Sequence, residues 1–491
     1  MLLPTRTLKT LPLPAALLLT LAACTIGPKY QRPPAPVPTA YKEPPPAEFK
    51  EWRQAHPNDG ALRGNWWEIY NDPGLNALEE QVGISNQNVL LAEAQFREAQ
   101  EAVRIARSNL FPFASTTAAY SNSRTSATLT TSPFGNLGVR NTFTFPLTAS
   151  YTPDVFGVIH RTIHGAQETA QATFAQLQNA RLLYQAELAQ DYFQLRGTDG
   201  DIDLLNRTVK SYQDYLTLTK NRFASGVASG GDVAQAETQL DTTKAQLIDL
   251  EVTRAQIEHA IAVLAGKPPA DVAVRGGPIT ITPPPIPIGL PATLLERRPD
   301  IASTERTMEA MNEQIGIARA AFFPDVTLSA TAGLQSVYFT KWWTWPSRFW
   351  SVGPQMAETL FDAGRRHAVE MQARDTFDAA IATYRQTVLT GFQQVEDNLA
   401  ALRILAEESR AQDLAVAAAQ RSLDIATYQY KAGTVDYLTV ITTQAILLED
   451  QRTSVDLVTR RMVASASLIQ ALGGGWDTSK LPTRDEIASA K

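Results

Sequence analysis

The chain has 491 residues, of which 44% are apolar and 19% are charged, and its formal net charge is −6. The apolar content excludes a disordered chain, and the mild acidity disfavours a nucleic-acid-binding protein, which would carry a basic face. The single cysteine excludes a disulfide-stabilised domain and a multi-cysteine metal site. No apolar run reaches the roughly 18 residues that a membrane-spanning helix needs. A globular protein, a coiled coil and a β-barrel remain as alternatives.

The first 23 residues have the pattern of a secretory signal peptide, with a short basic region before the apolar stretch Leu11–Ala23. Small residues precede Cys24, which is typical of a bacterial lipobox, where the chain is cleaved before the cysteine and a lipid is attached to its thiol. Thr25, in place of Asp, favours the outer membrane. We therefore expect residues 24–73, which are rich in proline, to form a lipid-anchored, extended segment. The alternative is ordinary cleavage with an incidental cysteine.

The rest of the chain contains an internal repeat with an offset of about 205 to 212 residues. Corresponding segments are Asn109–Pro112 with Ala321–Pro324, Val155–Gly157 with Leu360–Asp362, and Arg222–Gly226 with Gln429–Gly433. The predicted organisation is a first repeat at 74–267, a proline-rich connector at 268–300, a second repeat at 301–476 and a C-terminal tail at 477–491. Each repeat has the order helix, Phe-Pro break, two strands, very long helix, glycine hinge, helix.

Four segments alternate between apolar and small polar residues, which predicts strands at about 113–122, 141–152, 325–336 and 349–361. Each has about 10 residues, the span of a tilted transmembrane strand. Small uncharged side chains on the second face suit the wall of a lumen. A soluble antiparallel sheet with one solvated face would give the same alternation.

Aromatic residues favour the membrane interpretation. Tyr338–Trp350 contains a cluster of tyrosine, phenylalanine and tryptophan at one strand end and in its loop. Such a cluster is typical of the girdle at a membrane interface. A cluster buried under the loop is the alternative.

Two proline-free segments, 158–223 and 366–431, predict unusually long helices. Each would reach about 100 Å if continuous, and Gly197–Gly200 is a candidate break in the first. Four strands cannot close a barrel, and open sheet edges are not tolerated in lipid. Transmembrane strands would therefore require an oligomer, with the long helices continuing as a helical tube.

With these features, the sequence resembles the TolC/OprM outer-membrane factor family, in its NodT-type lipoprotein branch. The resemblance covers nearly the whole chain and is carried by five distinctive segments. They are Ile26–Pro33, Trp66–Pro73, Leu294–Ile301, Ile315–Pro324 and Ala471–Trp476.

The resemblance implies a mixed α and β fold and a homotrimer. Four strands per chain would form a 12-stranded outer-membrane β-barrel, continued by a periplasmic α-helical barrel. Family members are passive exit ducts of tripartite efflux pumps, without enzymatic activity. The implied partners are a periplasmic adaptor, an inner-membrane pump of the resistance–nodulation–division (RND) type, and outer-membrane lipid. No cofactor is expected beyond the covalent lipid on Cys24. A duct for ABC-type (type I) secretion and a lipid-anchored periplasmic scaffold are the alternatives.

Two glycine hinges, at 226–232 and 433–439, are the main candidates for a functional site. Gly226 can end the first long helix in the left-handed conformation, and Ser229 can cap the next helix. Gly433 and Asp436 are their counterparts in the second repeat. The resemblance places both hairpins at the periplasmic tip, in contact with the adaptor. Helix capping alone is the alternative role.

The resemblance also points to a gate at this tip. Family members often carry an Asp in the helix after the second hinge, whereas this sequence has Thr439 and Thr442 at the matching positions. The corresponding positions of the first repeat are Asp232 and Gln235, and Tyr430 matches an aromatic residue that helps to hold the tip closed. We expect a gate that is less acidic and depends more on packing.

Other candidate motifs point to no chemistry. His160 and His164 lie four residues apart without an acidic partner, so we expect surface positions and no metal site. No phosphate-binding, dinucleotide-binding or catalytic motif is present. In Arg297–Asp300 we expect Asp300 to cap a helix and the arginines to pair with acidic neighbours.

Overall fold

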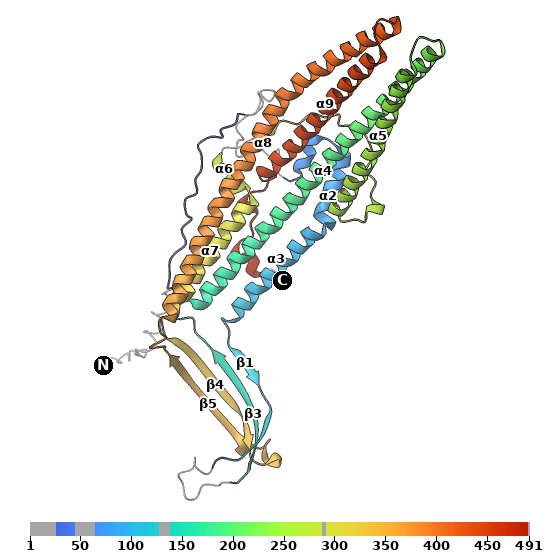
Figure 1. Cartoon of the computed structure of the whole chain (residues 1–491). Helices are drawn as coiled ribbons and strands as arrows, with labels where there is room; N and C mark the ends of the chain where they lie inside the picture. Colours follow the sequence, from blue (N-terminus) through green and yellow to red (C-terminus); the bar gives the residue numbers. More distant parts are fainter. Residues whose placement is uncertain (1–25, 45–63, 127–137, 287–290, 490–491) are drawn as a thin grey trace, which may run out of the picture.

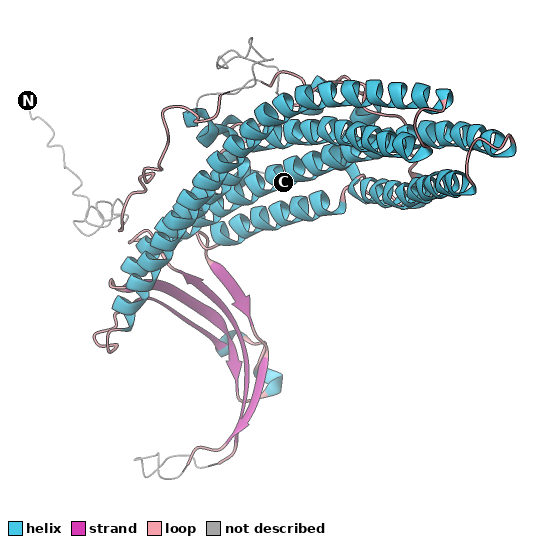
Figure 2. Cartoon of the chain, turned by 45° about the horizontal axis from the view of Figure 1, so that its top comes forward, coloured by secondary structure: helices cyan, strands magenta, loops and turns pink. Residues whose placement is uncertain are grey.

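The computed structural model describes residues 26–44, 64–126, 138–286 and 291–489. A bundle of long helices carries an antiparallel sheet at one end (Figure 1). The strands leave the bundle at the end opposite the two helix hairpins and form a curved sheet (Figure 2). In the described ranges, no helix is both long enough and apolar enough to cross a membrane. The expected lipid site, Cys24, and the signal peptide lie outside the described residues.

The two halves repeat one order of elements. The first half contains α2 (Pro73–Ser85), α3 (Gln87–Ser108), β1 (Phe113–Thr116), β2 (Ala119–Ser123), β3 (Arg140–Tyr151), α4 (Val158–Ala224) and α5 (Gly230–Leu264). The second half contains α7 (Pro299–Ala320), β4 (Asp325–Ser336), β5 (Arg348–Ala357), α8 (Arg365–Ala432) and α9 (Tyr437–Ala471). The short elements η5 (Pro269–Asp271) and α6 (Pro291–Arg297) lie in the connector.

Helix α4 runs unbroken for 67 residues, so the expected break at Gly197–Gly200 is wrong. Both glycines face α9. A Cβ atom on Gly197 would collide with the side chain of Thr459, and one on Gly200 would lie 3.2 Å from a methyl carbon of Val455. The glycines therefore permit close packing of the two helices. At 1.5 Å per residue, α4 is about 100 Å long.

The sheet has the strand order β1-β3-β4-β5, and β2 also pairs with β3. The expected strand at 113–122 is divided where Thr117 lies opposite Pro146 and Ala118 lies opposite Phe145, in the register that β1 and β2 share. Thr117 donates its N–H to the Pro146 carbonyl at 3.4 Å, but proline has no N–H to return. The ladder is therefore interrupted at this point.

The register aligns the apolar faces that alternation predicted. Phe145 pairs with Leu334, and Leu147 pairs with Ala332, which in turn pairs with Trp350. Much of this face is exposed, with Trp350 at 75%. The last strand ends at Ala357, four residues before the expected 361. The outer edges of β1, β2 and β5 pair with no other strand in the described part of the chain.

The aromatic cluster lies beside the free end of the sheet. The Phe143 ring lies 5.5 Å from the rings of Phe339 and Trp342. Phe339, Trp343 and Trp345 are 64%, 63% and 73% exposed. The alternative of a cluster buried within the chain is therefore wrong.

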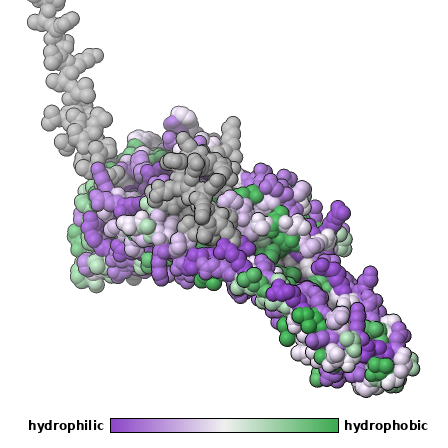
Figure 3. All heavy atoms as spheres, turned by 90° about the horizontal axis from the view of Figure 1, so that it is seen from above, coloured by the Kyte–Doolittle hydropathy of each residue, from purple (hydrophilic) through white to green (hydrophobic). Residues whose placement is uncertain are grey.

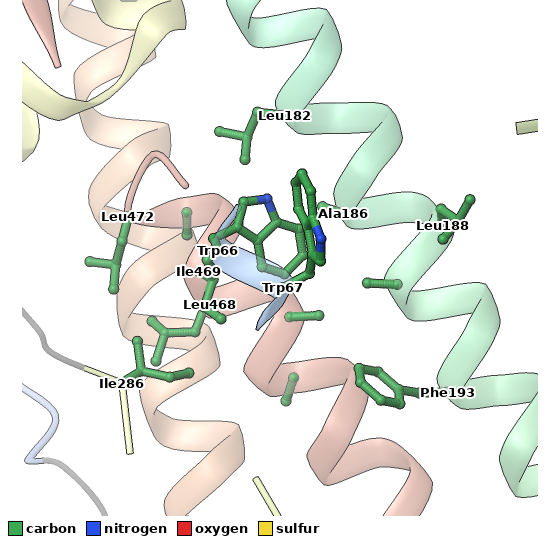
Figure 4. Packing of buried hydrophobic residues seen from close by; sticks show 14 of the residues in the cluster. Trp66, Trp67, Leu182, Ala186, Leu188, Phe193, Ile286, Leu468, Ile469 and Leu472 are labelled. Atoms are coloured by element: carbon green, nitrogen blue, oxygen red, sulfur yellow. The ribbon is translucent and has the colours of Figure 1, made fainter. Parts of the chain in front are cut away.

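The main hydrophobic core lies in the middle of the helical bundle. Element η3 (Trp66–Tyr70) places Trp66 and Trp67 between α4 and α9 (Figure 4). The Tyr70 hydroxyl lies 2.8 Å from Ser465 Oγ. This part of segment 24–73 was expected to be extended and is instead a buried helical turn. Aromatic side chains at three of its five positions supply apolar area that burial stabilises.

Both described terminal segments pack on the outside of the bundle. In the N-terminal segment, Arg32 forms an ion pair of 3.1 Å with Glu305. In the C-terminal tail, Arg484 pairs with Glu168 at 2.6 Å and with Glu309 at 2.9 Å. The side chain of Ile487 is buried against α3 and α4. These contacts join both ends of the chain to α4 and α7.

Apolar side chains are also exposed along the helices, where Figure 3 shows separate hydrophobic patches among polar atoms. On α8 and α9 the most exposed are Leu414, Ile425, Tyr428, Leu438 and Ile446, at 52% to 76%. Exposed apolar side chains do not stabilise an isolated chain in water. These positions are consistent with helices that pack against further protein.

Candidate functional site

The two hairpin turns have nearly the same backbone geometry. Gly226, after α4, has φ of +75°, and Gly433, after α8, has φ of +76°. A Cβ atom on Gly226 would meet no atom within 4 Å, so conformation rather than space requires glycine there. The prediction that these glycines end the long helices in the left-handed conformation is confirmed.

The helices that follow are capped differently. Ser229 Oγ accepts the N–H of Asp232 at 3.1 Å, and the Asp232 carboxylate accepts the N–H of Ser229 at 2.8 Å. This confirms the capping box. Asp436 accepts both the hydroxyl and the N–H of Thr439, at 2.8 and 3.1 Å. These hydrogen bonds, from the hydroxyl first and then from the backbone, lower the pKa of Asp436.

Of the expected gate residues, only Tyr430 is buried. Its exposed fraction is 3%, and its ring centroid lies 5.3 Å from that of Tyr437. Gln235, Thr439 and Thr442 are exposed, and Asp232 is half-buried. In one chain these polar side chains do not come together around Tyr430.

A hydrophobic cluster joins the two hairpins near the tip. Its buried members are Tyr212, Leu216, Ala236 and Leu240 from the first hairpin and Tyr430, Tyr437 and Val440 from the second. Burial is the main cause of the raised pKa of both Tyr212 and Tyr437. Their phenol groups therefore remain neutral over the physiological pH range.

Sequence reasoning missed a set of contacts between α4 and α8, here called the tip clasp: Tyr215, Thr219, Arg222, Thr427 and Tyr430. The Arg222 guanidinium lies 4.6 Å from the Tyr430 ring centroid and donates to the Lys431 carbonyl at 3.2 Å. Hydroxyl pairs join Tyr215 to Thr427 at 2.8 Å and Tyr430 to Thr219 at 3.5 Å. Helical periodicity could not reveal them, because each joins residues more than 200 positions apart.

A cavity of about 270 Å³ lies next to the tip clasp, between α4, α8 and α9. Gln444 lines it and is 2% exposed, yet neither atom of its amide group has a hydrogen-bond partner in the described structure. A polar group buried in this way destabilises the arrangement that buries it. The two hairpins are thus joined at the tip and less completely packed beside it.

Two secondary expectations need correction. His160 has an acidic partner, because its Nδ1 lies 2.5 Å from Asp154, although the histidine is exposed as expected. Asp300 lies in the first turn of α7, whose N-cap is Arg298, and it binds the Arg298 guanidinium at 2.6 Å. Within the described ranges, no group of three or more His, Cys, Asp or Glu residues could hold a metal ion.

Comparisons with known proteins identify the family of this chain. A family model described as outer membrane efflux protein matches residues 79–267 and 290–474. The toluene efflux pump outer membrane protein TtgF of Pseudomonas putida is 32% identical, over 96% of this chain and 98% of that protein. The cation efflux system protein CusC of Escherichia coli is 26% identical, over 94% of this chain and 98% of that protein.

A solved structure agrees at the level of the fold. The Campylobacter jejuni CmeC outer membrane channel superposes with a TM-score of 0.86, covering 95% of this chain and 98% of that one, at 21% identity. The extent of the family match and the identity to TtgF settle the family. The chain belongs to the outer membrane efflux protein family, whose members are outer-membrane channels and not enzymes, as the sequence resemblance implied.

Proposed function

We propose that this protein is the passive exit duct of a tripartite efflux pump and that it works as a homotrimer. The observation that carries the proposal is a sheet in which β1 and β2 share one of four strand positions. This sheet has open edges and an exposed apolar face, and it is joined directly to helices about 100 Å long. Lipid does not tolerate open edges, so three copies would close a 12-stranded barrel. The exposed apolar positions of α8 and α9 would then be covered by neighbouring copies.

The gate of this duct is proposed to lie at the hairpin tip. The tip clasp and the hydrophobic cluster hold the two hairpins of one chain together, so they oppose an outward movement of either hairpin. Three Asp232 carboxylates would give the tip a weak preference for cations, with Gln235, Thr439 and Thr442 as uncharged neighbours. Closure would therefore depend mainly on packing around Tyr430.

The turns themselves are proposed to contact a periplasmic adaptor, through the surface around Gly226, Ser229, Gly433 and Asp436. An RND-type inner-membrane pump would supply the energy. Cys24 is proposed to carry the lipid anchor. Relatives are named for toluene and for cation efflux, so the family leaves the cargo open.

Two measurements test the proposal. The purified protein is expected to conduct ions in a planar bilayer and to migrate on gels as a heat-modifiable oligomer. Absence of ion conductance in the bilayer, together with migration as a monomer on gels, would favour the periplasmic scaffold.

The partners are tested by a crosslinked pull-down from native membranes through a C-terminal tag. Recovery of an adaptor with an RND pump is the expected result. Recovery of an ABC exporter instead would assign the duct to type I secretion.

A further inference from the structure

Except at the end where the strands meet the helices, the sheet and its loops carry charge of one sign. Residues 113–153 and 326–357 contain four charged residues, Arg124, Arg140, Lys341 and Arg348, and no Asp or Glu. The flanking acidic residues, at positions 154, 325 and 358, lie at the other end of the sheet, where the strands meet the helices. All charged residues at the free end of the sheet are therefore basic.

All four basic residues lie at or just beyond the strand ends that are furthest from the helices. This free end is the lower end of the sheet in Figure 1. Arg140 pairs with Ser123 in the last row of β2 and β3, and Arg124 follows directly. Arg348 begins β5 opposite Leu334, and Lys341 lies in the loop between β4 and β5. The topology thus brings together basic residues from both halves of the chain.

Two of these cations lie against exposed aromatic rings. The Arg348 guanidinium carbon is 3.0 Å from the Trp345 ring centroid, and its Nε donates to the Trp345 carbonyl at 2.9 Å. Lys341 Nζ is 5.4 Å from the Tyr338 ring centroid. Tyr338 and Trp345 are 62% and 73% exposed. The face of an aromatic ring attracts a cation, so each ring favours a position of the basic side chain beside it.

The order of side chains along the sheet matches a membrane boundary. Trp350 and Val352, on the same face as Arg348, are 75% and 71% exposed and apolar. On this face Arg348 lies two residues beyond Trp350, about 7 Å further along the strand toward the free end. Aromatic rings prefer the headgroup level of a membrane, where lipid phosphates also lie. Apolar, aromatic and basic residues therefore follow one another toward the free end.

We propose that Lys341 and Arg348, supported by Arg124, bind the phosphate groups of glycolipids in the outer leaflet. The proposal rests on the proposed function, because it requires the sheet to cross the outer membrane. Guanidinium groups bind phosphate in a bidentate manner, and basic residues are attracted to an anionic membrane surface. Residues 113–153 and 326–357 contain no carboxylate that would compete with the lipid.

The test measures lipid preference in detergent, independently of conduction. Wild-type protein is titrated with diphosphorylated lipid A, with dephosphorylated lipid A and with inorganic phosphate, and tryptophan fluorescence is followed because Trp345 reports on the site. We expect at least a tenfold preference for the phosphorylated lipid and no response to inorganic phosphate.

The variant K341Q/R348Q should lose most of this preference. The matched control R97Q/K244Q removes one Arg and one Lys that are exposed on α3 and α5, and it should keep the preference. The conservative variant K341R/R348K retains both charges and should also keep it. Loss in K341R/R348K would indicate misfolding, and its oligomeric migration on gels checks this directly.

Two outcomes would overturn the inference: an unchanged lipid preference in K341Q/R348Q, or an equal response to inorganic phosphate. Failure of the proposed function is distinguishable, because it would appear as absent conductance of the wild-type protein in a planar bilayer. In that assay K341Q/R348Q should conduct like wild type.

Discussion

The two hairpin turns at the tip share a backbone but not an environment. Gly226 and Gly433 have φ values within 1° of each other. By contrast, the repeat aligns Phe223 with Tyr430, and these side chains are 52% and 3% exposed. Duplication thus preserved the turn, which depends on local conformation, while the two aromatic residues diverged in packing. The second-repeat aromatic joins the hairpins, and the first-repeat aromatic faces outward.

The largest expected effect is that of Tyr430→Ala. Removing a buried aromatic ring costs about 3 to 5 kcal/mol, and here the loss falls on the contact between the hairpins. We expect a lower thermal midpoint and a higher single-channel conductance. Phe223→Ala, at the equivalent exposed position, should change both only slightly. Equal effects of Tyr430→Ala and Phe223→Ala would contradict the asymmetry of the repeats. Unchanged conductance in both Tyr430→Ala and Asp232→Ala would contradict the assignment of the gate to the tip.

Arg222→Gln should have the next largest effect. It removes the cation–π contact with Tyr430 and the hydrogen bond to the Lys431 carbonyl, together about 1 to 2 kcal/mol. Conductance should rise, though less than in Tyr430→Ala. Lys220→Gln is the control, because it removes a charge two residues away that forms an exposed ion pair with Glu237. An equal rise in the control would indicate a general effect of charge.

Gly226→Ala and Gly433→Ala should have equal effects, because the two turns share one conformation. Each forces a Cβ into the left-handed region, at a cost of about 1 to 2 kcal/mol in unfolding free energy. Gly83→Ala is the control. No atom would lie within 4 Å of its added Cβ and its φ is ordinary, so it should be neutral or stabilising. A large difference between the two hinge variants would show that one turn has further contacts.

The smallest effect is a pH dependence confined to the second turn. Hydrogen bonds from Thr439 lower the pKa of Asp436 in the folded protein below its unfolded value. Its contribution is therefore present above the unfolded pKa and is lost as the pH falls through the folded one. Asp436→Ala should lower the thermal midpoint slightly at pH 7 and have no effect near pH 2. A constant difference across this range would show that Asp436 acts through packing.

Much of the fold follows from local pattern. Strand alternation predicted the two faces of the sheet, and the register places Phe145, Leu334 and their neighbours on one face as expected. Proline-free segments predicted both long helices, and Gly226 with Ser229 predicted the first turn and its cap. These features depend on residues a few positions apart, so a single sequence contains the whole signal.

Contacts between distant segments decided the rest. The sequence predicts a helix break at Gly197–Gly200, because only the position of Thr459 on α9 shows that Gly197 is a packing site. Pro146 divides the strand opposite it, which no pattern within residues 113–122 could reveal. Arg222 reaches the Lys431 carbonyl, 209 positions away. The sequence alone therefore determined the elements and their faces, whereas tertiary structure decided which side chains meet, because such contacts depend on the relative placement of whole helices.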